Sequence, residues 1–216
     1  PMDLRSKFLW YEPHVSIITG IAYDHINVFP TFDSYVETFD LYIKSHAPNG
    51  KYFWFEKDEH LAELTAKNST PEMSYNTPDF DVSKNGSTVH IDGRSYPLQI
   101  VGKHNLENLR AAQLVCAELG IDTAAFYKAA ASFTGAGRRM EKIIDKPNQV
   151  VYRDFAHSPS KLKATTEAIS ETYPGTLLAV FELHTFSSLN EDFLPLYKAT
   201  MQSADKAIVF YNDAVF

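Results

Sequence analysis

The N-terminal third of the chain alternates between short apolar runs and longer stretches whose apolar residues recur at helical spacing. A short β-branched run predicts a buried strand, and apolar residues three and four apart predict an amphipathic helix. Thr31 and Asp33 are both residue types that cap a helix start. The order strand, helix, strand, helix indicates a parallel sheet. The strands are Val15 to Ile21 and Lys51 to Phe55, and the helices are Thr31 to Ile43 and Asp58 to Lys67.

Residues 71 to 101 follow a different pattern, in which alternating residues flank the turn dipeptides Asn85-Gly86 and Asp92-Gly93. Such dipeptides join neighbouring antiparallel strands. We therefore expect a small β-meander appended to the parallel sheet. Two helices follow it, at about Asn105 to Leu119, stopped by Gly120, and at about Thr123 to Ser132.

A second α/β segment begins after Phe133 to Gly137, which is the best linker candidate in the chain because it carries two glycines. Strand and helix patterns alternate beyond this linker, as in a parallel α/β fold. The expected elements are strands at Val150 to Tyr152, Leu177 to Phe181 and Lys206 to Tyr211, and helices at Pro159 to Thr172 and Phe193 to Ser203.

Composition narrows the class of protein. The chain has 216 residues, a net charge of -7 and one cysteine, Cys116. An acidic chain is not a general nucleic-acid binder, and no apolar run is long enough for a membrane span. A lone cysteine in a helical apolar pattern predicts a buried thiol and fits a reducing, cytoplasmic setting. The start at Pro1-Met2 and the end just after a core strand suggest a piece excised from a longer protein.

Gly102 to Ala112 is the most informative stretch of the sequence. Asn105 and Asn108 are three residues apart at the start of a helix, so both lie on one face of its first turns. Two carboxamides offer paired donors and acceptors to a planar heterocycle such as a nucleobase. The stretch therefore predicts a nucleotide-type site.

Four further polar clusters stand at the ends of predicted strands or at the linker. Asp24-His25 suits a metal ion or a hydrogen-bonded loop. Arg138-Arg139 suits phosphate, because guanidinium forks match it bidentately, or surface ion pairs. Asp154 and His157 precede a helix and serve either as caps or in a crevice at the strand ends. Glu182 to Ser187, which includes His184, occupies the matching position after the next strand.

The sequence lacks several common catalytic motifs. It contains no Gly-x-x-x-x-Gly-Lys-[Ser/Thr] loop and no Gly-x-Gly-x-x-Gly fingerprint. It also contains no Gly-x-Ser-x-Gly and no His-Glu-x-x-His. Serine hydrolases of that type, zincins and dinucleotide-type Rossmann sites are therefore unsupported, and no phosphate-binding loop lies within these residues.

Together the clusters resemble the Mur ligases, the ATP-dependent amide-forming enzymes of peptidoglycan synthesis. The resemblance runs through nearly the whole chain and rests on ordered motifs. Ile17 to His25 resembles the family segment ITNIExDH, and Gly102 to Ala112 resembles GxHNxxNxxAA. Phe133 to Glu141 resembles FxGxxRRxE. Asp154 to Pro159 resembles DYAHHP, and Ala179 to Ser187 resembles xVFxPHxxSR.

Within the family, Leu4 to Phe8 and Tyr23 to Phe29 resemble most the murein peptide ligase branch, which joins UDP-N-acetylmuramate to a recovered tripeptide. The UDP-N-acetylmuramate–L-alanine ligase branch is the second choice. Glu37 to Phe39 stand where other branches carry a carbamylated lysine. Thr185 and Ser188 stand where the alanine ligases carry arginines for the substrate, and this departure leaves the acceptor open.

The resemblance implies the fold and its division. It implies an α/β fold in which residues 1–134 are the C-terminal part of a central ATPase domain, with a parallel sheet and a small β-meander. Residues 135–216 would be part of a Rossmann-like C-terminal domain. The UDP-binding domain, the phosphate-binding loop and the catalytic glutamate of the family would precede this chain, so the isolated chain is expected to be inactive.

The resemblance also implies a role for each matching residue. His25 would help to bind a magnesium ion and act as a catalytic residue. His104, Asn105 and Asn108 would hold the adenine of ATP, Asp154 would contact the ribose region, and Arg138 would reach the phosphates catalytically. On the substrate side of the cleft the resemblance implies His157 and His184.

The implied reaction activates the carboxylate of UDP-N-acetylmuramate with ATP and Mg²⁺ as an acyl phosphate, which an amino-acid or peptide amine then attacks. This reaction belongs to cell-wall biogenesis and hence to cell shape and division. Two other readings stay open. One is a non-catalytic nucleotide-sensing or scaffold module on the same fold. The other is folate or cyanophycin-type ligation, which shares the superfamily.

Overall fold

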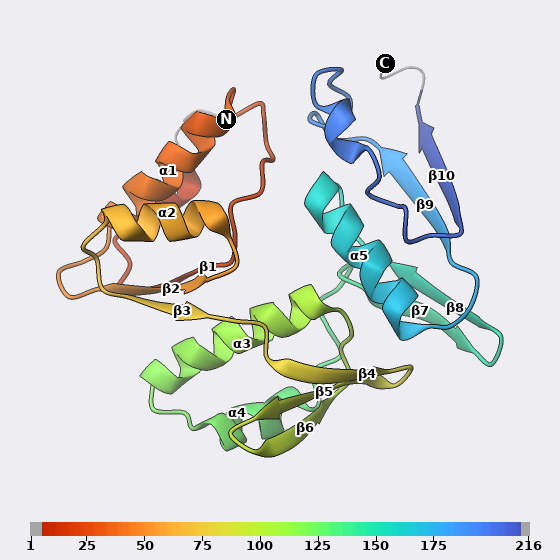
Figure 1. Cartoon of the computed structure of the whole chain (residues 1–216), viewed down its shortest axis with the longest axis horizontal. Helices are drawn as coiled ribbons and strands as arrows, with labels where there is room; N and C mark the ends of the chain where they lie inside the picture. The colour runs from red at the N-terminus through yellow and green to blue at the C-terminus, as the bar shows by residue number, and fades with distance from the viewer. Residues whose placement is uncertain (1–5, 213–216) are drawn as a thin grey trace. The chain divides into compact units, whose positions relative to one another are not determined.

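The computed structural model describes residues 6–212 of the chain. The chain divides into two compact units. The first unit comprises residues 1–77 and 107–126, and the second comprises residues 78–106 and 127–216. Figure 1 shows the order of the elements along the chain. The predicted boundary after residue 134 stays a prediction. Leu4 and Arg5, which belong to one of the family-like segments, lie outside the described residues.

A three-stranded parallel sheet with order β1-β2-β3 forms the centre of the first unit. Its strands are β1 (Val15–Ile18), β2 (Lys51–Phe55) and β3 (Glu72–Tyr75). The predicted parallel sheet is confirmed. The assignment of residues 72–75 to the meander is wrong, because they pair in parallel with β2, Tyr52 opposite Glu72. The first strand ends at Ile18 rather than Ile21, because the amide of Ile21 donates instead to Asp58 Oδ2, at 2.7 Å.

Helices cover both faces of this sheet, as Figure 1 shows. On one face α1 (Phe32–Lys44) and α2 (Glu59–Lys67) bury a core of Ile18, Ile21, Ile43, Tyr52, Leu61 and Leu64. On the other face the later turns of α3 (Lys103–Glu118) contribute Ala111 to a cluster with Phe53 and Tyr75. A 3₁₀ turn, η1 (Lys7–Trp10), precedes β1. The strands are therefore buried from two sides, as their continuous apolar runs indicated.

Local capping chemistry fixes where these helices begin. Thr31 accepts a hydrogen bond from the amide of Ser34 in a reciprocal capping box, which confirms Thr31 rather than Asp33 as the cap of α1. Asp58 caps α2 by accepting from the amide of Leu61. Both caps satisfy amides that have no partner within the helix.

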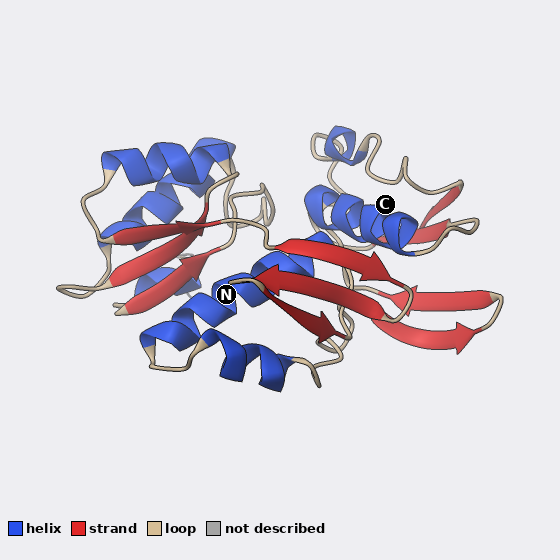
Figure 2. Ribbon diagram, turned by 60° about the horizontal axis from the view of Figure 1, so that its bottom comes forward, coloured by secondary structure: helices blue, strands red, loops and turns tan. Residues whose placement is uncertain are grey.

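The second unit contains the predicted meander, formed by β4 (Asp79–Ser83), β5 (Gly86–Ile91) and β6 (Arg94–Leu98). These strands are antiparallel in the order β4-β5-β6, as Figure 2 shows. The ring of Tyr127, in helix α4 (Thr123–Ala130), stacks on Tyr96 of β6 with ring centroids 4.8 Å apart. The two turn dipeptides therefore predicted this sheet correctly.

The remaining part of the second unit contains two small sheets and one long helix. An antiparallel hairpin of β7 (Glu141–Lys146) and β8 (Gln149–Arg153) precedes α5 (Pro159–Thr172). Two parallel strands, β9 (Leu178–Leu183) and β10 (Lys206–Tyr211), follow. The pattern analysis predicted β8, α5, β9 and β10 and missed β7. The mixed α/β class is confirmed.

The helix predicted at residues 193–203 is wrong. Only a short 3₁₀ turn, η2 (Leu194–Tyr197), forms there. Pro195 has no amide hydrogen to donate, Lys198 is extended with φ -55° and ψ 130°, and Ala199 is left-handed with φ 63°. A right-handed helix cannot continue through these backbone angles. Among the described residues, no helix has the length and apolarity needed to cross a membrane.

Candidate functional site

Helix α3 begins directly after a glycine whose conformation disfavours residues that carry a Cβ atom. Gly102 has φ +92°, and its carbonyl accepts hydrogen bonds from the amides of Asn105 and Leu106, at 3.0 and 3.2 Å. A Cβ atom on Gly102 would lie 3.0 Å from both His104 Cε1 and Met140 Sδ. The glycine therefore permits the close approach of the helix start to Met140.

The side chains at this helix start lie in the second unit and contact other residues of the same unit. Asn105 Nδ2 donates to the carbonyl of Val101 at 2.8 Å and to Met140 Sδ at 3.4 Å. His104 is half-buried, and burial lowers the pKa of its imidazole, while the nearby Asp154 carboxylate acts in the opposite direction. His104 is therefore neutral near pH 7, with one ring nitrogen able to accept a hydrogen bond. Asn108, one turn further along α3, is exposed.

Asp154 also contacts Met140. Its Oδ2 accepts a hydrogen bond from the amide of Met140 at 2.6 Å. Met140 is buried against Val101 and Ala168. Three of the residues predicted to bind ATP, His104, Asn105 and Asp154, are thus gathered around Met140. The sequence analysis did not select Met140, although Met140 directly follows the predicted pair Arg138-Arg139.

The predicted arginine pair is part of a tight turn joined to the β7–β8 hairpin. Arg138 has φ 58° and donates its amide hydrogen to Glu141 Oε2 at 2.9 Å. Its carbonyl accepts from the amide of Phe155 at 2.8 Å. The guanidinium of Arg139 lies over the ring of Phe155, with Cζ 5.7 Å from the ring centroid. The segment is therefore fixed from Arg138 onward.

Glu141 has a second cationic neighbour, because Arg153 lies directly opposite it in the hairpin and donates to Oε2 at 3.0 Å. The hydrogen bond from the Arg138 amide, followed by the pairing with Arg153, lowers the pKa of the Glu141 carboxyl. Glu141 is consequently ionised throughout the neutral range. The sequence analysis did not select Glu141 or Arg153 as functional residues.

The two predicted substrate-side histidines flank one aromatic ring. The ring of Phe155 lies 4.9 Å from the ring of His157 and 6.0 Å from that of His184, measured between centroids. His157 Nδ1 is 2.9 Å from the carbonyl of Phe155, and His184 Nδ1 is 3.2 Å from the carbonyl of Glu182. Both histidines follow strands, β8 and β9, at their carboxyl ends. Phe155, which is 43% exposed, links them to Arg139.

Asp24 and His25 lie in the first unit, in the loop after β1. Asp24 is buried and accepts the amide hydrogen of His25 on Oδ1 at 2.8 Å, while its Oδ2 is 3.7 Å from His25 Nε2. His25 is left-handed, with φ 58°, and its side chain is 62% exposed. The pair thus presents one carboxylate and one exposed imidazole, both of which are groups that bind divalent cations.

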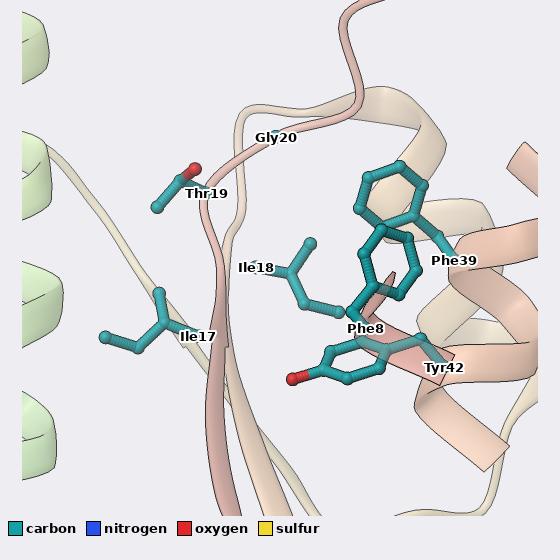
Figure 3. Close-up of a pocket in the computed structure, with 7 residues that line it drawn as sticks. All are labelled: Phe8, Ile17, Ile18, Thr19, Gly20, Phe39 and Tyr42. Carbon is teal, nitrogen blue, oxygen red and sulfur yellow. The ribbon is translucent and has the colours of Figure 1, made fainter. Parts of the chain in front are cut away.

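A cavity of about 260 Å³ lies in the first unit at the carboxyl end of β1. Figure 3 shows the rings of Phe8, Phe39 and Tyr42 on the same side of β1 as Ile18, while Ile17 and Thr19 point the other way. None of the predicted site residues lines it. Its apolar lining distinguishes it from the polar cluster around Met140.

Comparison with known proteins gives a consistent result. Residues 3–116 match the family model described as the Mur ligase middle domain. A UDP-N-acetylmuramate–L-alanine ligase of Desulfitobacterium hafniense is 28% identical over 220 residues, covering 96% of this chain and 49% of the relative. The corresponding ligase of Paenarthrobacter aurescens is 31% identical over 216 residues, covering 94% and 47%. The chain thus spans about half the length of these relatives.

Solved structures share the fold. A MurF ligase of Thermotoga maritima in complex with ADP superposes with a TM-score of 0.73 and 16% identity, covering 93% of this chain and 53% of that protein. A murein peptide ligase of Psychrobacter arcticus gives a TM-score of 0.64 with 20% identity, covering 99% and 47%.

Proposed function

This chain belongs to the Mur ligase family, and we propose that it forms part of an ATP-dependent, ADP-forming amide ligase acting on UDP-N-acetylmuramate. The acceptor that we propose is a wall peptide, with L-alanine as the alternative. The observation that carries the proposal is the gathering of His104, Asn105 and Asp154 around Met140. The ADP complex of the Thermotoga maritima MurF ligase, which shares the fold, supports the choice of nucleotide. A cytoplasmic setting is part of the proposal.

In this proposal the nucleobase is recognised by neutral polar groups. A neutral His104 and the carboxamides of Asn105 and Asn108 form hydrogen bonds with the edge of adenine. Adenine is itself uncharged, so these neutral groups suit it. Asp154 meets the ribose region through Oδ1, the carboxylate oxygen that does not accept from the Met140 amide. Arg138 binds the phosphates, for which a guanidinium fork is suited.

The ligation step proceeds through an acyl phosphate. The muramate carboxylate attacks the γ-phosphoryl group of ATP, ADP leaves, and the acceptor amine displaces phosphate from the acyl carbon to form the amide. Arg138 would stabilise the negative charge that spreads over the transferring phosphoryl oxygens. His157 and His184, on either side of Phe155, would bind the acceptor and orient its amine.

Magnesium fits the loop after β1. Asp24 supplies a carboxylate and His25 an exposed imidazole 3.7 Å away, and Mg²⁺ is commonly held by one or two carboxylates together with substrate phosphates and waters. When bound, the ion would neutralise charge on the transferring phosphate. In this chain Asp24 and His25 would hold such an ion at the carboxyl end of β1.

The acceptor preference rests on the segment after β9. Thr185 and Ser188, at the positions where the alanine ligases carry arginines, bind each other through Thr185 Oγ1 and Ser188 Oγ at 3.0 Å. Ser188 is 1% exposed. The two hydroxyls offer no cation to a substrate carboxylate, which favours an acceptor other than the one the alanine ligases use.

The test uses the complete ligase with UDP-N-acetylmuramate and ATP, and compares ADP release with L-alanine and with a wall tripeptide. Arg138→Ala should raise the KM for ATP by about tenfold or more, because a hydrogen bond to a charged partner contributes roughly 1.5–3 kcal/mol. Asn105→Ala should raise it by about two- to tenfold, because a hydrogen bond between neutral groups contributes roughly 0.5–1.5 kcal/mol. The matched controls Asn85→Ala and Arg94→Ala, at exposed positions of the meander, should leave it unchanged.

Unchanged ATP kinetics in both site variants would refute the site. A protein that binds nucleotide but forms no amide with either acceptor would support the nucleotide-sensing module instead. For the 216-residue chain alone we expect no ATP turnover, because it contains no phosphate-binding loop.

A further inference from the structure

The turn between the linker and β7 contains two left-handed residues that are not glycine. Arg138 has φ 58° and Met140 has φ 45°. This conformation is disfavoured for residues that carry a Cβ atom. Such a backbone persists only where the surrounding structure holds it, and it is concentrated at functional sites. The groups that hold this turn therefore bear on its function.

Each of the two left-handed residues donates its amide hydrogen to a carboxylate. The amide of Arg138 is 2.9 Å from Glu141 Oε2, and the amide of Met140 is 2.6 Å from Asp154 Oδ2. Hydrogen bonds to an ionised acceptor are roughly twice as strong as those between neutral groups. Two carboxylates, one at the start of β7 and one directly after β8, therefore fix the backbone on both sides of Arg139.

Glu141 is itself held by a cation. Arg153 is the cross-strand partner of Glu141 and donates to the same oxygen, Oε2, that accepts from Arg138. Both side chains of the pair are partly exposed, so as a simple ion pair it would add little to stability. Its effect is to fix the direction in which the carboxylate points.

We propose that Glu141, held by Arg153, is a positioning residue that aims Arg138 at the phosphates of ATP. This inference rests on the proposed function of Arg138. The neighbouring guanidinium of Arg139 lies over Phe155, and the amide of Phe155 binds the carbonyl of Arg138. Glu141 and Phe155 thus hold Arg138 by its amide and by its carbonyl, and its side chain leaves a backbone that is fixed at both groups.

The decisive experiment measures the KM for ATP and kcat in the complete ligase. Glu141→Ala should raise the KM for ATP about tenfold, as expected for the loss of a hydrogen bond to a charged acceptor. Glu141→Gln keeps an acceptor for the Arg138 amide, so its KM for ATP should stay close to the wild-type value. In an Arg138→Ala background Glu141→Ala should have no further effect, because the two residues act as one unit.

A charge reversal separates positioning from ion pairing. Glu141→Arg combined with Arg153→Glu rebuilds the ion pair but places no carboxylate near the amide of Arg138, so the KM for ATP should stay raised. Asp145→Ala removes an ion pair within the hairpin that does not involve Glu141, Lys142 to Asp145 at 3.0 Å, and should leave the KM unchanged. Full rescue by the reversed pair would overturn the proposal.

A second measurement needs no nucleotide. In the 216-residue chain, hydrogen exchange of the amides at 138–141 should be faster in Glu141→Ala than in the wild type, and nearly unchanged in Glu141→Gln. Unchanged exchange in Glu141→Ala would contradict the positioning role. If Arg138→Ala leaves ATP kinetics unaltered, the proposed ATP role of Arg138 fails. A strong effect of Arg138→Ala with none of Glu141→Ala refutes the positioning role alone.

Discussion

Replacement of Gly102 by alanine should destabilise the second unit more than an ordinary glycine-to-alanine change. Gly102 has φ +92°, a conformation that costs an alanine about 1–2 kcal/mol. The added Cβ would also lie 3.0 Å from His104 Cε1, 3.0 Å from Met140 Sδ and 3.1 Å from Ala168 Cβ. Overpacking of this kind costs roughly 1–3 kcal/mol. The free energy of unfolding should therefore fall by about 2–5 kcal/mol, the sum of the two effects.

Gly135 supplies the matched control within the same unit. It is also left-handed, with φ +102°, but the nearest atom to an added Cβ is the carbonyl oxygen of Arg139 at an ordinary 3.6 Å. Gly135→Ala should consequently lower the free energy of unfolding only through the backbone conformation, by about 1–2 kcal/mol. The excess cost of Gly102→Ala then isolates crowding at the start of α3.

Urea unfolding of both variants, followed by far-UV circular dichroism, measures the two free energies. Met140 has a flexible side chain and can move aside, which favours the lower end of the range for Gly102→Ala. Ala168 has no such freedom. Equal destabilisation in the two variants would show that the close approach of Met140 and Ala168 to Gly102 does not govern this position, and the reasoning would be refuted.

Three further predictions concern single residues. Because burial lowers the pKa of His104 below its ordinary 6.5, its contribution to stability is complete above that value and is lost as the pH falls. Acidification from about pH 7.5 to 5.5 should therefore lower the urea midpoint more in the wild type than in His104→Gln. An equal decrease in both proteins would show that His104 does not cause this pH dependence. Asp58→Ala removes acceptors from the amides of Leu61 and Ile21, at 2.9 and 2.7 Å, and should cost about 1–3 kcal/mol in urea unfolding, whereas a cost near zero would contradict the capping role. Leu61→Ala, at a fully buried position, should cost about 3–5 kcal/mol, against less than about 0.5 for the exposed Leu119→Ala.

Most elements could be predicted because their signals are local. A cap such as Thr31 or Asp58 acts within one helical turn, and Pro159 sets the first turn of α5 through its own backbone. The two turn dipeptides likewise determine the hairpins that they close. Such interactions involve residues a few positions apart, so the order of the residues contains them.

The errors arose where local preference competed with the rest of the fold. Residues 193–203 contain helix-forming residues, but the helical conformation stops at the extended Lys198 and the left-handed Ala199. The strand β3 has an unremarkable sequence and forms because β2 offers it a parallel edge. The charged strand β7 has no apolar face to reveal it, although the Pro147-Asn148 turn after it was a usable signal.

The sequence by itself determined the family, the class of fold and the identity of the polar residues proposed for the site. Its motifs identified His104, Asn105, Arg138 and Asp154 as residue types suited to a nucleotide. Their spacing did not predict which contacts they make in the folded chain. Only the tertiary structure placed Met140 among them, and only the register of β7 and β8 put Arg153 opposite Glu141. Hydrogen bonds between residues far apart in the chain depend on the path of the backbone, which the packing of the whole unit decides.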